Sequence, residues 1–67
     1  MATQAFEKHG FRFVAGDIYT YCGSKGREWI AQRRGGGGWI RAMATHMPLR
    51  ATRQEIVDRF HNLGLFD

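Results

Sequence analysis

The fold is decided by the stretch at residues 27–43, which reads REWIAQRRGGGGWIRAM. Two short segments that mix large apolar side chains with arginines flank four consecutive glycines. Glycine adopts the backbone conformations that tight turns require, whereas tryptophan and isoleucine favour strands. The stretch therefore predicts a β-hairpin whose tip is the run Gly35–Gly38.

The sequence on the N-terminal side of this hairpin is rich in β-branched and aromatic residues. Residues 11–14 and 18–22 predict two short strands, separated by a turn at residues 15–17. Residues 23–26 predict a second turn that leads into the central hairpin. Residues 1–9 are ambiguous, because their composition suits either a short helix or an extended arm.

On the C-terminal side, a helix is predicted within residues 52–64. Thr52 and Glu55 have the spacing of a capping box, in which the Thr52 hydroxyl accepts from the Glu55 amide and the Glu55 carboxylate accepts from the Thr52 amide. One apolar stripe follows at helical spacing, made of Ile56, Val57, Phe60 and Leu63. Gly64 is expected to end the helix in the left-handed conformation, with Leu65 or Phe66 folding back in a Schellman motif.

These elements predict an α+β fold, a small antiparallel β-meander of three to four strands packed against one C-terminal α-helix. Pro48 cannot donate to a sheet ladder, so residues 45–51 are expected to be a connector. A chain of 67 residues has room for one thin core, and we expect a single small basic domain over residues 1–67. Cys22 is the only cysteine, so no internal disulfide can stabilise that core. Good packing or self-association would have to stabilise the fold instead.

Positive charge is concentrated in the middle of the chain. The net charge is +4, and residues 18–53 hold seven cations and one anion, a net charge of +6 for that segment. Eight of the ten cations are arginines, which suit bidentate phosphate contacts and stacking on rings. This bias favours an anionic partner.

Strand alternation predicts how the side chains divide between the two faces of the sheet. Hairpins centred on Gly36 and Ser24 would pair Arg33 with Trp39 and Tyr21 with Arg27. One face would then collect an arginine-aromatic set, made of Tyr19, Tyr21, Arg27, Trp29, Arg33, Trp39 and Arg41. The face covered by the helix would carry Ile18, Thr20, Cys22, Ile30, Ile40 and Ala42.

An exposed face of this kind predicts nucleic-acid binding. Rings stack on unpaired bases and guanidinium groups bind phosphates, whereas a sheet that enters the major groove of DNA presents arginine to guanine. The first hypothesis is therefore a non-enzymatic nucleic-acid-binding protein, with DNA favoured and a regulatory role. The candidate binding residues are Lys25, Arg27, Arg33, Arg34, Arg41, Trp29, Trp39, Tyr19 and Tyr21, together with the loop at residues 33–38.

Two other interpretations use the same residues. Tryptophan, tyrosine and arginine are enriched at interface hot spots, so the second hypothesis is a protein-interaction module. Such a module would be an adaptor or inhibitor that docks on an acidic protein surface, or a homodimer. In the structural alternative, the aromatic rings pack in the core beneath arginine stems, and the glycine run is a surface loop without a partner.

The sequence offers little for catalysis, metal binding or membrane insertion. His9, His46 and His61 have no metal-ligand spacing, and Glu55 and Asp58 have structural duties early in the predicted helix. We therefore expect no enzyme activity, no metal and no cofactor. No apolar run approaches the roughly 18 residues that span a bilayer, and a single cysteine suits a reducing compartment, so a cytoplasmic protein is expected.

Overall fold

Three tight turns organise the chain. The computed structural model describes residues 5–67, apart from the side chain of Tyr21. Its four strands, β1 (Ala5–Lys8), β2 (Phe11–Tyr21), β3 (Ser24–Gly35) and β4 (Gly38–Pro48), are joined by two-residue turns. Each turn has positive φ at both residues: 56° and 81° at residues 9–10, 52° and 81° at residues 22–23, and 56° and 83° at residues 36–37. Positive φ at both positions is the requirement of a type I′ turn, whose twist matches that of the strands it joins.

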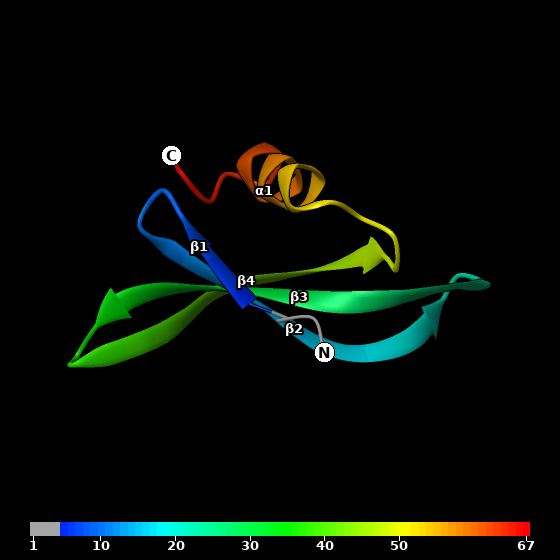
Figure 1. Ribbon diagram of the computed structural model, residues 1–67, viewed down its shortest axis with the longest axis horizontal. Coiled ribbons are helices and arrows are strands. Elements are labelled where there is room, and N and C mark those ends of the chain that lie inside the picture. Colours follow the sequence, from blue (N-terminus) through cyan, green and yellow to red (C-terminus); the bar gives the residue numbers. More distant parts are fainter. Residues whose placement is uncertain (1–4) are drawn as a thin grey trace.

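The four strands form one antiparallel sheet in the order β1-β2-β3-β4, followed by the helix α1 (Arg53–Asn62). The predicted α+β meander with one C-terminal helix is therefore confirmed. Figure 1 shows α1 over one side of the sheet, while the β2–β3 and β3–β4 hairpin ends project in opposite directions. The molecule measures 37 × 28 × 18 Å. Among the described residues, no helix has the length and apolar character needed to cross a membrane.

The first strand corrects the expectation of a helix or an arm at residues 1–9. Residues 5–8 pair with β2 across the turn at residues 9–10, while residues 1–4 lie outside the described part of the chain. Phe6 lies opposite Phe13, and their rings stack with centroids 5.1 Å apart. This ring contact and the ladder stabilise an extended conformation that propensity alone does not favour.

Strand β2 runs without a break through the turn predicted at residues 15–17. The register passes from Ala15 opposite Trp29 to Ile18 opposite Arg27, so β2 holds one extra residue as a β-bulge. The turn predicted at residues 23–26 is instead at residues 22–23. Strand β4 likewise extends into the predicted connector, where Pro48 is its last residue and lies opposite Gly26. A proline is compatible with the end of an edge strand.

Between each of the two hairpin turns and the next bulge, the predicted registers are wrong by an odd number of residues. Arg34, and not Arg33, pairs with Trp39, and Tyr21 pairs with Ser24 in place of Arg27. Shifts of one and three residues move side chains to the opposite face of a sheet, because side chains alternate with a period of two. The division of side chains between the two faces therefore differs from the predicted one.

Helix α1 begins and ends as predicted. The Glu55 amide donates to the Thr52 hydroxyl at 3.2 Å and the Thr52 amide donates to the Glu55 carboxylate at 2.8 Å, which completes the capping box. At the other end Gly64 has φ of 91°, and the Leu65 amide donates to the Phe60 carbonyl at 3.0 Å. These are the left-handed glycine and the long hydrogen bond of a Schellman motif.

The core lies between α1 and the sheet. Ile56, Val57 and Phe60 of the predicted stripe are buried, and the rings of Phe60 and Phe13 lie 5.4 Å apart. Leu63 is 47% exposed, so its predicted place in the stripe is wrong. Leu65, carried back by the Schellman motif, packs against the core. The buried apolar side chains of the sheet are Phe13, Trp29, Ala31 and Met47.

Gly26 provides a test of how closely the end of the sheet is packed. A Cβ atom at residue 26 would lie 2.5 Å from the Met47 carbonyl oxygen and would also collide with the His46 ring. We expect Gly26→Ala to lower the free energy of unfolding by about 1–3 kcal/mol, as overpacking does. Urea denaturation followed by circular dichroism measures this change.

Gly38→Ala is the matched control. A Cβ atom at residue 38 meets nothing within 4 Å, and Gly38 is not among the glycines with positive φ. This substitution should leave stability unchanged or raise it by up to about 1 kcal/mol, because alanine restricts the unfolded chain. Equal stability of the two variants would contradict the close approach of β3 and β4 at residue 26.

Candidate functional site

The sheet face opposite α1, which we call the open face, is covered by no helix or strand of residues 5–67 (Figure 1). Because Phe13 is packed beneath α1, its strand neighbour Arg12 points to the open face. The register places Glu7 beside Arg12 on β1, and Gln32 and Arg41 beside it on β3 and β4. One row of polar and charged side chains therefore crosses all four strands.

The next row of the open face adds Arg34 and Trp39, which lie opposite each other on β3 and β4. The Arg34 guanidinium carbon is 5.0 Å from the centroid of the Trp39 ring, and that of Arg12 is 6.0 Å from it. Cation–π contacts at exposed sites contribute about 0.5–1 kcal/mol each and leave the guanidinium N–H groups able to bind another partner. We call Arg12, Arg34, Trp39 and Arg41 the Arg–Trp cluster.

Two polar features border the Arg–Trp cluster. Glu28 and Arg41 form an ion pair at 4.0 Å, with side chains 36% and 65% exposed. An exposed pair at this distance holds Arg41 only weakly, so its guanidinium remains able to bind an anion. Gln32 lies between Arg12 and Arg41, and its buried Oε1 atom has no hydrogen-bond partner in the described part of the chain.

The β3–β4 hairpin end extends the Arg–Trp cluster into a narrow ribbon. β2 begins at Phe11, which pairs with Arg33, so the ribbon beyond that pair is only two strands wide. Its tip at residues 35–38 consists of glycine alone. Arg33 is exposed and points to the α1 side of the sheet, because it shares a row with Phe11. The tip therefore carries backbone groups only, with one arginine on each side just behind it.

The opposite end of the open face is less basic. The rings of Tyr19 and His46 meet edge to face with centroids 4.7 Å apart. Lys25 is exposed near the β2–β3 turn, and the side chain of Tyr21 lies outside the described part of the chain. By strand alternation Lys25 shares the α1 side of β3 with Arg27 and Trp29, at a distance along the sheet from the Arg–Trp cluster.

The predicted arginine-aromatic face is divided between the two sides of the sheet. Trp29 is 9% exposed and lies in the core, where its ring is 5.9 Å from that of Phe6. Arg27 and Arg33 share its side of β3, whereas Trp39, Arg41 and Tyr19 lie on the open face. The odd register shifts cause this division. Trp29 cannot contact a ligand on the open face.

The predicted covered face needs the same correction. Ile30 points to the open face, and Ile18 and Ile40 are 50% and 39% exposed. Cys22, expected inside, is exposed because it occupies a turn with φ of 52°. Thr20 and Ala42 are also exposed, and Ala42 is the extra residue of a bulge in β4.

Arg12 was missing from the predicted site. The local sequence Phe11-Arg12-Phe13 does indicate that Arg12 lies on the open face, because side chains alternate along a strand and both phenylalanines point inward. Its contact with Trp39 depends on the register of three strands, which no local pattern supplies. The structure thus brings together Arg12, Arg34, Trp39 and Arg41, and separates Trp29, Arg27 and Lys25 from them.

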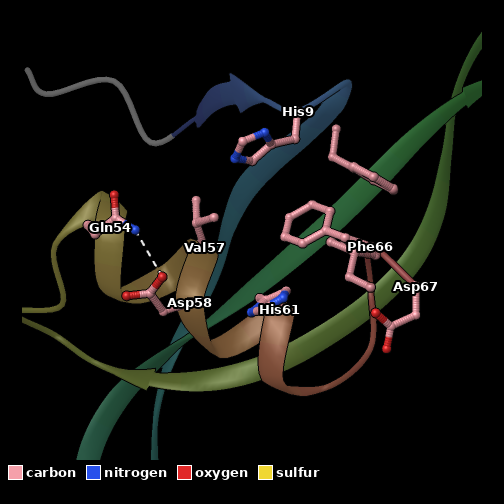
Figure 2. A pocket seen from close by; sticks show the side chains of 9 residues that line it. His9, Gln54, Val57, Asp58, His61, Phe66 and Asp67 are labelled. Carbon is pink, nitrogen blue, oxygen red and sulfur yellow. Dashed lines mark hydrogen bonds between the residues drawn. The ribbon is translucent and has the colours of Figure 1, made fainter.

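The α1 side of the molecule has a hollow of its own, separate from the open face. The cavity measures about 610 Å³, and Figure 2 shows Phe66 between its histidines. The Phe66 ring centroid is 5.3 Å from that of His9 and 6.1 Å from that of His61. Asp58 on the wall accepts a hydrogen bond from Gln54 at 2.9 Å. Within residues 5–67, no three histidine, cysteine or acidic side chains are grouped to hold a metal ion.

By its fold and site, the protein has an α+β fold that pairs a four-stranded antiparallel meander with one helix, and its open face carries the Arg–Trp cluster. No protein-family model, no curated protein and no solved structure matches the chain.

The two tryptophans are expected to differ in solvent access. In Trp39→Phe the remaining fluorophore is the buried Trp29, which should emit at shorter wavelength and resist quenching by iodide. In Trp29→Phe the remaining Trp39 is half-buried and should be quenched more strongly, since iodide reaches only exposed rings. Iodide titration of both variants measures this difference. Equal quenching constants would contradict the division of the tryptophans between core and open face.

Proposed function

We propose that this protein binds nucleic acid through the Arg–Trp cluster and the β3–β4 hairpin end. The observation that supports this most directly is the pair of guanidinium groups of Arg12 and Arg34 around Trp39 on the open face. The contact with one ring fixes both cations on the same side of the sheet. Pre-positioned guanidinium groups bind phosphate oxygens at a smaller entropic cost than free side chains.

The distribution of acidic residues supports the same proposal. Residues 29–54 contain no aspartate or glutamate, and three of their five arginines, Arg33, Arg34 and Arg41, lie on β3 and β4. This segment includes most of β3, all of β4 and the hairpin end. Of the acidic residues near the open face, Glu7 lies on β1, and Glu28 and Asp17, which is in the β2 bulge opposite it, lie in the half of the sheet away from the tip. A polyanion at the hairpin end would therefore meet cations without an opposing carboxylate at the tip.

The proposed role is non-enzymatic. Binding nucleic acid requires only the arginines, the ring and the polar row, and a regulatory function through DNA fits these groups. A single cysteine, exposed at a turn, suits a cytoplasmic protein in a reducing environment.

One observation favours a second candidate function, self-association. Val14, Ile30 and Ala44 form a half-buried apolar row in the middle of the open face. Arg12 and Arg41 lie on one side of this row, and Glu28 lies on the other. In a two-fold face-to-face dimer, the arginine row of one copy would meet Glu28 of the other. Sedimentation equilibrium at micromolar concentration distinguishes this dimer from a monomer.

The test of nucleic-acid binding is its salt dependence. If Arg12, Arg33, Arg34 and Arg41 each neutralise one phosphate, the slope of log affinity against log salt should be about −3 to −4, because each contact contributes about −0.9 on duplex DNA. Titration with random oligonucleotides, followed by fluorescence anisotropy of the labelled strand at several salt concentrations, measures this slope.

The double variant Arg12→Ala, Arg34→Ala should lose about two units of slope. Its control, Arg50→Ala with Arg59→Ala, removes the same charge from exposed positions outside the sheet and should change the slope by less than about half a unit. A slope near zero for the unmodified protein, or equal effects of the two double variants, would exclude the proposed interface.

A further inference from the structure

We infer that the partner is B-form duplex DNA and that the β3–β4 hairpin end enters its major groove with the glycine tip first. This inference rests on the proposed function and specifies the nucleic acid and the direction of docking. It is supported by the width of the ribbon, the composition of its tip and the placement of Arg33 and Arg34.

The dimensions of the hairpin end match the major groove. Beyond the pair of Phe11 with Arg33, only β3 and β4 continue, so the ribbon is two strands wide. Two strands lie about 5 Å apart, and with their side chains they fit a groove about 12 Å wide. From Arg33 to Gly36 the chain advances three residues, about 10 Å at 3.4 Å per residue, which is close to the groove depth of about 8.5 Å. The minor groove, about 6 Å wide, is too narrow for this ribbon.

The tip is built to approach the base pairs closely. Gly36 and Gly37 form the turn, and Gly35 and Gly38 close it, so no side chain projects from the leading edge. A Cβ atom at residue 35 would lie 2.6 Å from Ile40 Cδ1, but one at residue 36, 37 or 38 would meet nothing within 4 Å, so packing within the protein explains only the first glycine of the run. A type I′ turn requires positive φ at residues 36 and 37 only, so backbone conformation does not explain why residue 38 is a glycine. Close contact with a ligand would explain it.

The arginines behind the tip point in opposite directions. Arg33 faces the α1 side of the ribbon and Arg34 faces the open side, and both are exposed. In a ribbon that lies flat in the groove, one of the two would point away from the DNA. With the tip inserted first, each arginine faces one wall of the groove, where the phosphates of the two strands lie. This arrangement explains two consecutive arginines better than docking of the open face alone.

The same geometry disfavours single strands and duplex RNA. Single-stranded binding relies on rings with free faces, but Trp39 already has two guanidinium groups beside it and Trp29 is buried. The major groove of A-form RNA is deep and narrow, and protein side chains cannot enter it. A tip of glycine backbone also reads base edges poorly, so little sequence preference is expected.

The first experiment compares three ligands of one mixed sequence by fluorescence anisotropy at 0.1 M salt: duplex DNA, single-stranded DNA and duplex RNA. We expect duplex DNA to bind at least tenfold more tightly than either of the others. A duplex whose cytosines carry glucosylated 5-hydroxymethyl groups, which fill the major groove, should lose at least tenfold in affinity. Equal or tighter binding of RNA or of the single strand, or full affinity for the glucosylated duplex, overturns the inference.

The second experiment separates insertion of the tip from docking of the open face. Tip insertion predicts similar losses of affinity for duplex DNA in Arg33→Ala and Arg34→Ala, each with a salt slope reduced by about one. Docking of the open face predicts that Arg33→Ala behaves like the control Arg50→Ala. If no oligonucleotide binds at all, the proposed function itself fails. If binding occurs without dependence on Arg33, only the tip-first mode fails.

Discussion

The geometry of three two-residue turns determines which side chains this protein shows to solvent. At each turn both residues have positive φ, so the strands on either side begin to pair at once, with no loop between them. Pairing Gly35 with Gly38 sets Arg34 opposite Trp39, and pairing Tyr21 with Ser24 sets Tyr19 opposite Gly26. Because side chains alternate with a period of two, a turn one residue longer would exchange the two faces of a strand. The core and the open face both depend on these turns.

Local chemistry was sufficient to predict α1 and the class of fold. The capping box at Thr52 and the left-handed Gly64 satisfy backbone groups within a few residues of themselves, so their sequence pattern is complete in one short segment. The meander follows from β-branched and aromatic runs separated by glycine. By contrast, β1 is only four residues long, and the contact between the Phe6 and Phe13 rings stabilises it. The strand propensity of residues 5–8 does not predict this contact.

The register of the strands was not predictable from local patterns, and this is why the observed candidate site differs from the predicted one. Four consecutive glycines allow several hairpin centres, and the choice among them places either Arg33 or Arg34 opposite Trp39. The turn at Cys22 and Gly23 is also difficult to predict from the sequence, since positive φ is uncommon for a residue with a side chain such as Cys22. Two bulges then shift the pairing again within β2 and β4. Arg41 and Trp39 lie on the face that was predicted for them. Trp29 lies in the core, and Arg12, which was not predicted, belongs to the Arg–Trp cluster.

The thin core and the open face are two consequences of one helix on a four-stranded sheet. The ten residues of α1 cover the middle of one face, and its acidic side chains Glu55 and Asp58 lie on that side of the molecule. The acid-free segment at residues 29–54 supplies β4, most of β3 and the hairpin end. Positive charge is therefore concentrated near the hairpin end, which projects beyond α1 (Figure 1). The field of this protein orients it before contact, because a polyanion attracts the arginines around the hairpin end, whereas α1 carries Arg53 and Arg59 beside Glu55 and Asp58 and has no net charge. The orientation it favours presents the hairpin end first, which is the end with a side-chain-free tip and an arginine on each side.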